Sequence, residues 1–316
     1  MNDIRVNKNT REVKMKAIDI SKYGGPEVLE YEDAPDPSPG PDEVLVQVAA
    51  TSINPIDIKR RSGEAKAFAP VSFPGILGID VSGTIIRLGP GVKGFSEGDR
   101  VFGMANQTYA ERCVVKAANL AKIPSSLDTV DAAALPLVAT TGYQLIKDGA
   151  LDGQKRSVLV TGALGGVGRS AVFTAKSLGA TVIAGVRKKQ VEQAAALGAD
   201  SIVAIDDADA ISNLPVLDAV ADTVDGAIAE ALIGKVKSGG VFASVLGPPK
   251  NSAKFPGIKV VPVFAHADAQ ALLQLAKAVI EGRLKIPIAS KMPLKKAADA
   301  HALAEKGAGG KVLLLP

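Results

Sequence analysis

The chain has 316 residues, a formal net charge of +4 and a single cysteine, so an intramolecular disulfide framework and a zinc site built on several thiolates are excluded. Aromatic residues make up only 4% and tryptophan is absent; with no long basic block in the chain, we expect no nucleic-acid partner. No apolar run approaches the ~18 residues that a membrane span needs, so we predict none.

The first residues of the chain are polar. Residues 1–14 lack the apolar centre of a signal peptide, and together with the single cysteine this favours a cytoplasmic protein in a reducing compartment. We predict that residues 1–14 are a disordered extension, with Met15 as an alternative start.

The next part of the chain is predicted to be rich in β-strands. Residues 15–21 and 43–53 have strand patterns, and a proline-rich connector at 35–41 separates them. Between 78 and 124 short apolar segments alternate with turns, which is typical of a small antiparallel barrel or sandwich. The length of the whole chain suits two domains.

The pattern changes near residue 127, where a helix is predicted over 128–147. Strands and helices then alternate, which predicts a doubly wound parallel sheet. The predicted strands are 157–161, 181–186, 201–205, 216–222 and 240–246, and the helices are 169–178, 190–197 and 227–237. A helix at 269–281, a further helix and a strand at 311–315 follow. We expect a domain of residues 15–126 and 267–316, and a second domain of residues 127–266.

A glycine-rich loop carries the strongest local signal. The apolar strand 157–161 runs into glycines that open a helix, as a dinucleotide pyrophosphate requires, because backbone must approach the phosphates and helix N–H groups must point at them. Ala163 occupies the first glycine place of the G-x-G-x-x-G pattern. The predicted cofactor-binding residues here are Gly162, Ala163, Gly165, Gly166, Val167 and Gly168.

The residues after the second strand of this unit favour NADPH over NADH. An NAD site usually has an acidic residue there to bind the ribose hydroxyls. Here Arg187, Lys188 and Lys189 follow the strand, at a helix start where the dipole disfavours cations. An anionic 2′-phosphate would relieve that cost, so we predict that Arg187 and Lys189 bind it.

Four ordered motifs resemble the quinone oxidoreductases of the medium-chain dehydrogenase/reductase superfamily. They are Tyr-Gly-Gly-Pro-Glu-Val-Leu at 23–29, Ser-Ile-Asn-Pro-Ile-Asp at 52–57 followed by Arg-Ser-Gly at 61–63, Gly-Asp-Arg-Val at 98–101, and the glycine loop at 162–168. The resemblance covers about residues 15–316. It implies an α/β protein with a GroES-like β-barrel catalytic domain, a Rossmann domain with a doubly wound parallel sheet, a cleft between them and a homodimer.

The resemblance also implies the chemistry, which is NADPH-dependent reduction of quinones, enones and alkenals. Zinc-containing relatives have a cysteine where Asn54 stands and a histidine where Ile79 stands, so we expect no metal. We expect His301 to be a packing or surface residue and Cys113 to be a small buried hydrophobe.

Asn54 and Thr141 are the predicted catalytic residues, and both are also expected to contact the cofactor. The Asn54 amide could bind the nicotinamide ribose or the substrate oxygen. Val245, Leu246 and Gly247 end a strand that the resemblance places beside the nicotinamide. Asp57 and Arg61 are expected to structure a loop after Asn54, with an ion pair between them as one option. The largely small and apolar loop 64–71 is expected to line a pocket mouth for a small apolar carbonyl or quinone substrate.

Two other function classes stay open at this point. An enoyl-thioester reductase would share the fold and differ in substrate. A non-enzymatic NADPH-binding or RNA-binding role is the other alternative, against which the lack of a basic stripe counts. The sequence leaves open the physiological substrate, the proton donor and the oligomeric state.

Overall fold

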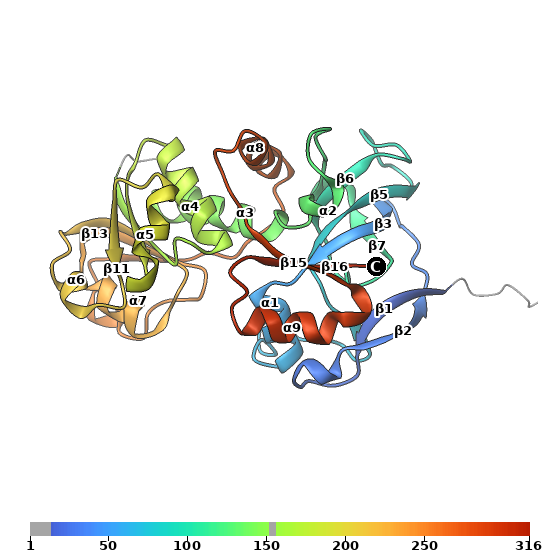
Figure 1. Cartoon of the computed structure of the whole chain (residues 1–316), viewed down its shortest axis with the longest axis horizontal. Coiled ribbons are helices and arrows are strands. Elements are labelled where there is room, and N and C mark those ends of the chain that lie inside the picture. Colours follow the sequence, from blue (N-terminus) through green and yellow to red (C-terminus); the bar gives the residue numbers. More distant parts are fainter. Residues whose placement is uncertain (1–13, 152–155) are drawn as a thin grey trace, which may run out of the picture.

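The strands of the described residues form a six-stranded sheet in one half of the molecule and two further sheets in the other half. The computed structural model describes residues 14–151 and 156–316. Figure 1 shows a parallel sheet with its helices at one end of the molecule, a mainly antiparallel half at the other, and helices α3 and α8 between them. None of the described helices is long and apolar enough to cross a membrane.

The mainly antiparallel half brings both ends of the described chain together. Its larger sheet has the order β15-β16-β3-β5-β6-β8, with β7 also paired to β3, and a smaller sheet has the order β2-β1-β4. The larger sheet contains β3 (Glu43–Ser52), β5 (Asp80–Leu88), β6 (Arg100–Met104), β7 (Arg112–Lys116), β8 (Leu120–Lys122), β15 (Ile288–Pro293) and β16 (Lys311–Leu315), and the smaller contains β1 (Lys14–Ile20), β2 (Glu30–Pro35) and β4 (Gly75–Ile76). The last strand, β16, runs antiparallel to β3, with Leu313 opposite Ser52.

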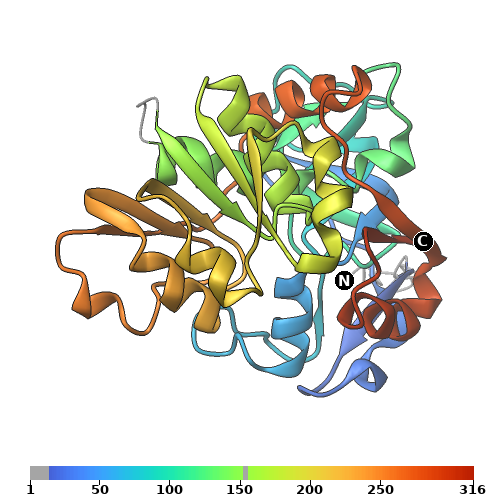
Figure 2. The same cartoon turned by 60° about the vertical axis from the view of Figure 1, so that its left-hand side comes forward.

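The six-stranded sheet is parallel throughout and has the order β11-β10-β9-β12-β13-β14. Its strands are β9 (Ser157–Thr161), β10 (Thr181–Val186), β11 (Ser201–Ala204), β12 (Leu217–Asp222), β13 (Val236–Ser244) and β14 (Lys259–Pro262). This is the 3-2-1-4-5-6 order of a dinucleotide-binding sheet, and the order reverses between β9 and β12. The predicted doubly wound sheet is therefore confirmed. Figure 2 turns this sheet toward the viewer.

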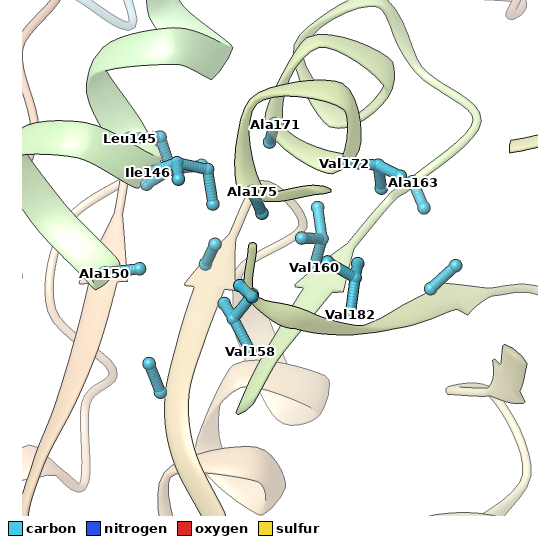
Figure 3. Close-up of a cluster of buried hydrophobic side chains, with 14 of the residues drawn as sticks. Leu145, Ile146, Ala150, Val158, Val160, Ala163, Ala171, Val172, Ala175 and Val182 are labelled. Carbon is cyan, nitrogen blue, oxygen red and sulfur yellow. The ribbon is translucent and has the colours of Figure 1, made fainter. Parts of the chain in front are cut away.

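Alternate residues of β9 face opposite sides of the parallel sheet. Val158 and Val160 pack with Ala171 and Ala175 of α4 (Gly166–Ser177), together with Leu145 (Figure 3). Leu159 belongs to a separate core cluster with Val220, Leu232 and Phe242. The strand is buried on both faces, which explains why its sequence is continuously apolar. Helices α5 (Val191–Ala194), α6 (Ala208–Ser212) and α7 (Gly226–Ile233) complete the connections in this half.

The helix predicted over 128–147 is broken, and that prediction was wrong. It forms α2 (Thr129–Ala132), α3 (Pro136–Gln144) and a π-helix at Leu145–Ala150. The Asp128 side chain caps α2 by accepting hydrogen bonds from the N–H groups of Val130 and Asp131, at 2.9 and 3.1 Å. Pro136 has no N–H to continue a helix, so a new one begins there.

Other local predictions also need correction. Residues Pro55–Ser62 form helix α1 where a loop was expected, because Pro55 starts the helix and the Asp57 side chain accepts a hydrogen bond from the Asn54 N–H at the helix start. Lys14 belongs to β1 and not to an extension; the rest of that predicted segment, residues 1–13, lies outside the described residues. Residues 236 and 237 lie in β13 and not in a helix, since α7 ends before Gly234.

Helices α3 and α4 touch at Gly142. A Cβ atom at Gly142 would lie 2.3 Å from the Val167 carbonyl oxygen and 2.6 Å from Ser170 Cβ. The Ser170 hydroxyl also donates to the Ala139 carbonyl at 2.6 Å. Because α4 begins at the glycine loop, this contact sets the position of the loop relative to α3. Helices α8 (Ala269–Ile280) and α9 (Ala297–Glu305) complete the fold.

We predict that Gly142→Ala destabilises the protein by about 1–3 kcal/mol, because the added methyl group would meet backbone atoms that cannot move freely. Urea unfolding measures the loss. Gly234→Ala is the matched control, since a Cβ at this helix end would meet only ordinary contacts at 3.5 Å or more and its backbone is helical. Equal stability of the two variants would contradict the proposed contact.

Candidate functional site

The glycine loop has the geometry of a phosphate site. Gly162 has a positive φ of 59°, and a Cβ there would lie 2.5 Å from Thr223 Oγ1. At Gly168 a Cβ would lie 2.2 Å from the Gly162 carbonyl oxygen, so only glycine lets helix α4 pack this closely on the strand end. Gly165 is the N-cap of α4, which directs the first N–H groups of that helix toward the loop.

A buried carboxylate, Asp222, lies where the strand order reverses. It accepts hydrogen bonds from Thr161 Oγ1 and from Ser244 Oγ, both at 2.9 Å, and from the Val224 N–H at 3.2 Å. These bonds tie together the ends of β9, β12 and β13. Our sequence analysis did not identify Asp222, although the polar residue that ends each of the strands β9, β12 and β13 was a usable signal.

Val245, Leu246 and Gly247, which are predicted to lie beside the nicotinamide, come directly after the strand end that Asp222 binds. The Val245 N–H donates to the Asp222 carbonyl at 3.2 Å, and the Leu246 N–H donates to Ser244 Oγ at 3.0 Å. Gly247 has a positive φ of 104°. The three residues therefore leave β13 at the edge of the sheet that also carries the glycine loop.

The basic segment after β10 separates into paired and unpaired cations. Lys188 is paired with Asp207 at 3.2 Å, and its N–H donates to Asp206 at 2.6 Å. Arg187 and Lys189 are exposed, and neither makes an ion pair within residues 14–151 and 156–316. Both therefore keep their charge free beside the end of β10, the strand next to β9.

The Asn54 side chain is 1% exposed and lies in a buried polar cluster. Its Nδ2 group donates to Asp80 Oδ2 at 2.8 Å and to the Ser52 carbonyl at 3.3 Å. Its Oδ1 atom accepts from Lys311 Nζ at 2.6 Å. Both amide hydrogens are thus used within the protein, and the remaining capacity of the amide is one lone pair on Oδ1.

Asp80 connects this cluster to helix α3. Its Oδ1 atom accepts from the Leu137 N–H at 2.7 Å. Thr141, one turn further along α3, donates its hydroxyl to the Leu137 carbonyl at 2.6 Å and is 7% exposed. The structure therefore links Asn54 through Asp80 to the helix that carries Thr141, and α3 in turn contacts the glycine-loop helix. Sequence reasoning missed Asp80 and Lys311, although a lysine that opens an otherwise apolar strand was a signal.

The expected option of an ion pair between Asp57 and Arg61 was wrong. Asp57 accepts from the Asn54 N–H at 3.0 Å. Arg61 lies one turn further along α1. One terminal nitrogen of its guanidinium pairs with Glu305 Oε1 at 2.5 Å, and the other lies 3.2 Å from His301 Nδ1. The reason is that α9 packs against this region and supplies an acidic partner that the sequence could not place.

His301 and Cys113 are both packing residues. His301 is buried, and its Nε2 atom lies 3.2 Å from the Tyr109 hydroxyl. Burial, together with the neighbouring Arg61 charge, lowers the pKa of His301 to about 3, so the ring is neutral at neutral pH. Burial raises the pKa of the Cys113 thiol to about 12, which makes it unreactive. Among the described residues no three His, Cys, Asp or Glu side chains are placed to hold a metal ion.

A hollow of about 560 Å³ lies in the antiparallel half, lined by residues such as Met15, Ala34 and Arg112. None of its lining residues belongs to the glycine loop, to α1 or to the loop at 64–71. It is therefore separate from the glycine loop and from the polar cluster around Asn54, and we do not place the reaction there.

The parallel sheet, its glycine loop at the reversal of strand order and the mainly antiparallel half define a medium-chain dehydrogenase/reductase. Comparisons with known proteins agree. The family model described as the alcohol dehydrogenase GroES-like domain matches residues 40–125, and the model described as a zinc-binding dehydrogenase matches residues 197–314. The predicted combination of a GroES-like domain with a Rossmann sheet is thus confirmed.

Individual relatives narrow the assignment. The chain is 32% identical to a chloroplast envelope quinone oxidoreductase homolog of Arabidopsis thaliana, over 96% of this chain and 98% of the relative. It is 32% identical to the NADPH-dependent alkenal/one oxidoreductase of the same plant, covering 96% and 80%. The solved quinone oxidoreductase of Coxiella burnetii matches with a TM-score of 0.84 and 29% identity, covering 96% and 100%. The chain belongs to the quinone oxidoreductase family of oxidoreductases.

Burial of Asp57 predicts a measurable pH dependence of stability. Burial raises the pKa of Asp57 to about 6 from its usual value near 3.8. A carboxyl group with a raised folded-state pKa destabilises the folded state when ionised, so stability falls as pH rises from about 4 through 6. The difference between the two pKa values corresponds to about 3 kcal/mol.

We therefore expect the stability of Asp57→Asn relative to the unsubstituted protein to increase by up to about 3 kcal/mol between pH 4 and pH 7.5. Urea unfolding at both pH values measures it. Asp299→Asn, which removes a carboxylate with 61% side-chain exposure, is the control. A relative stability of Asp57→Asn that does not change with pH would refute the buried ionisation.

Proposed function

We propose that this protein transfers hydride from NADPH to quinones or α,β-unsaturated carbonyl compounds such as enones and alkenals. The reaction class rests on family membership and on the names of relatives that act as quinone or alkenal/one oxidoreductases. The observation that carries the cofactor choice is the pair of unpaired cations, Arg187 and Lys189, beside the glycine loop.

The choice of NADPH follows from electrostatics. Two free cations at the end of β10 stand where an NAD site would have an acid. An adenosine 2′-phosphate would neutralise them and accept charge-assisted hydrogen bonds, while NADH would leave them unsatisfied. Lys188, already paired with Asp207, contributes less.

The protein supplies binding and orientation in this proposal, while NADPH supplies the hydride. Gly162, Ala163, Gly165, Gly166, Val167 and Gly168 form the pyrophosphate site at the start of α4. Val245, Leu246 and Gly247 flank the nicotinamide, and Thr141 contacts it from α3. Together these elements would hold two flat molecules in register, and such positioning lowers the barrier to the transfer.

Asn54 has a narrower role than the sequence suggested. Its two amide hydrogens are donated to Asp80 and to the Ser52 carbonyl, so a direct bond to a substrate oxygen would require breaking one of them. Its remaining Oδ1 lone pair can accept from a hydroxyl, such as one on the nicotinamide ribose. We propose that Asn54 positions the cofactor, and that water supplies the proton to the reduced product.

The remaining assignments also belong to this proposal. We place a catalytic domain at residues 15–126 and 267–316 and a cofactor domain at 127–266, in a homodimer. Among the described residues β14 is an edge strand of the parallel sheet, and Phe264 just beyond it is 79% exposed; in the proposed dimer a second copy covers both. Cytoplasmic location stays a prediction, since relatives include proteins named as chloroplastic.

Absorbance at 340 nm with NADPH or NADH, and with 1,4-benzoquinone, a simple enone or crotonyl-CoA, tests the function. We expect NADPH oxidation with the quinone or enone, and weak NADH oxidation. Fast turnover of crotonyl-CoA alone would favour the enoyl-thioester reductase. NADPH binding without turnover of any acceptor would refute the proposed activity and favour a binding role.

Variants test the cofactor choice separately. Arg187→Ala and Lys189→Ala should each raise the KM for NADPH about tenfold or more, since each loses a charge-assisted contact, and leave the KM for NADH little changed. Lys176→Ala is the charge-matched control, because Lys176 lies in the last turn of α4 and is paired with Asp200. Equal losses for both cofactors would rule out 2′-phosphate recognition.

A further inference from the structure

Lys311 and Asp80 form a buried ion pair between segments that are far apart in the chain. Lys311 Nζ lies 3.4 Å from Asp80 Oδ2, and the two side chains are 8% and 0% exposed. The ammonium also donates to the Ile53 carbonyl at 3.0 Å and to Asn54 Oδ1 at 2.6 Å. Burying two charges costs desolvation free energy that their attraction often does not repay. Stability alone therefore does not explain why this pair is present.

The ammonium fixes the orientation of the Asn54 amide. An ammonium group has three donors and no acceptor, so the atom of Asn54 that faces it must be the oxygen. The NH₂ group then has to face Asp80, which accepts from it at 2.8 Å. Because Lys311 lies on β16 and Asp80 on β5, residues of two strands fix the two polar atoms of the amide.

The same pair also sets the start of helix α3. Asp80 uses its other oxygen to accept from the Leu137 N–H at 2.7 Å, and Leu137 accepts from Thr141 Oγ1 at 2.6 Å. The Asn54 N–H donates to the Asp57 carboxylate in the first turn of α1. One buried pair thus joins the N-cap residue of α1 to the first turn of α3, and α3 contacts the glycine-loop helix at Gly142.

We propose that Lys311 and Asp80 are positioning residues for hydride transfer, which hold Asn54 at the N-cap of α1 and Thr141 on α3 at a fixed separation. The proposal rests on the proposed reductase activity. The pair itself touches neither substrate nor cofactor. Its effect on the reaction is geometric, and displacement of about 1 Å in such a site can cost up to about 100-fold in rate.

The pair could instead serve only to compensate charge in the fold. A double substitution distinguishes this structural role from the positioning role. Lys311→Met alone leaves the Asp80 charge buried without its partner and should destabilise the fold. Lys311→Met combined with Asp80→Asn removes both charges, so thermal stability should largely recover. If the pair only compensates charge, activity recovers with it; if the pair positions the site, activity does not.

We expect the full-length double variant to have a kcat about 10- to 100-fold below that of the unsubstituted protein, with the KM for NADPH within about twofold. The deuterium isotope effect on kcat with NADPH deuterated at the transferred position should rise, because hydride transfer becomes slower than the other steps. The isotope effect and the KM do not depend on how much of the sample is folded, so both remain informative if part of the double variant is unfolded.

The matched control is Lys291→Met combined with Asp131→Asn. This ion pair joins β15, a strand of the same sheet, to helix α2, but its side chains are 45% and 40% exposed. Its activity should not change. Full kcat and an unchanged isotope effect in folded Lys311 and Asp80 variants would overturn the positioning role alone. If the unsubstituted protein fails to oxidise NADPH in the presence of every acceptor tested, the reductase activity and this inference are both overturned.

Discussion

The Asp80 carboxylate is the constraint on which much of the structure depends. It is fully buried, so its charge must be met by donors inside the protein. Those donors come from β16 (Lys311), from the end of β3 (Ser52), from the cap of α1 (Asn54) and from the start of α3 (Leu137). Segments more than 200 residues apart in the chain are therefore required to meet at one carboxylate, and the C-terminal strand cannot pair elsewhere in the sheet without leaving that charge unsatisfied.

Asp222 has a comparable role in the parallel sheet. It is also fully buried and collects hydroxyl and backbone donors from the ends of three neighbouring strands. Asp80 is bonded to the first turn of α3, and Asp222 is bonded to the end of β9, which leads into the glycine loop and α4. The carboxylates of Asp80 and Asp222 accept their hydrogen bonds from groups within the protein. In the cofactor half, the groups that remain for a ligand are the backbone N–H groups of the glycine loop and the exposed cations after β10.

The cofactor half of the candidate site was predictable because its signals are local. The glycines at 162–168 follow a buried strand and open a helix, and this pattern alone predicts a phosphate site. The basic residues after β10 were also visible, but the sequence could not distinguish Lys188 from Arg187 and Lys189. Only the fold brings Asp207 to Lys188. Likewise, Arg61 was identified as a structural residue, but its partner Glu305 is supplied by the distant helix α9.

The sequence by itself determined the parallel sheet, the glycine loop and the family, because short-range periodicity and closely spaced motifs record local backbone requirements. Tertiary structure alone decided that the Asn54 amide hydrogens face inward, that α1 is a helix capped at Asn54, and that Lys311 and Asp80 form a buried pair. The physical reason is that a hydrogen bond or ion pair between distant segments depends on which strands become neighbours, and sheet neighbours leave no regular spacing in the sequence.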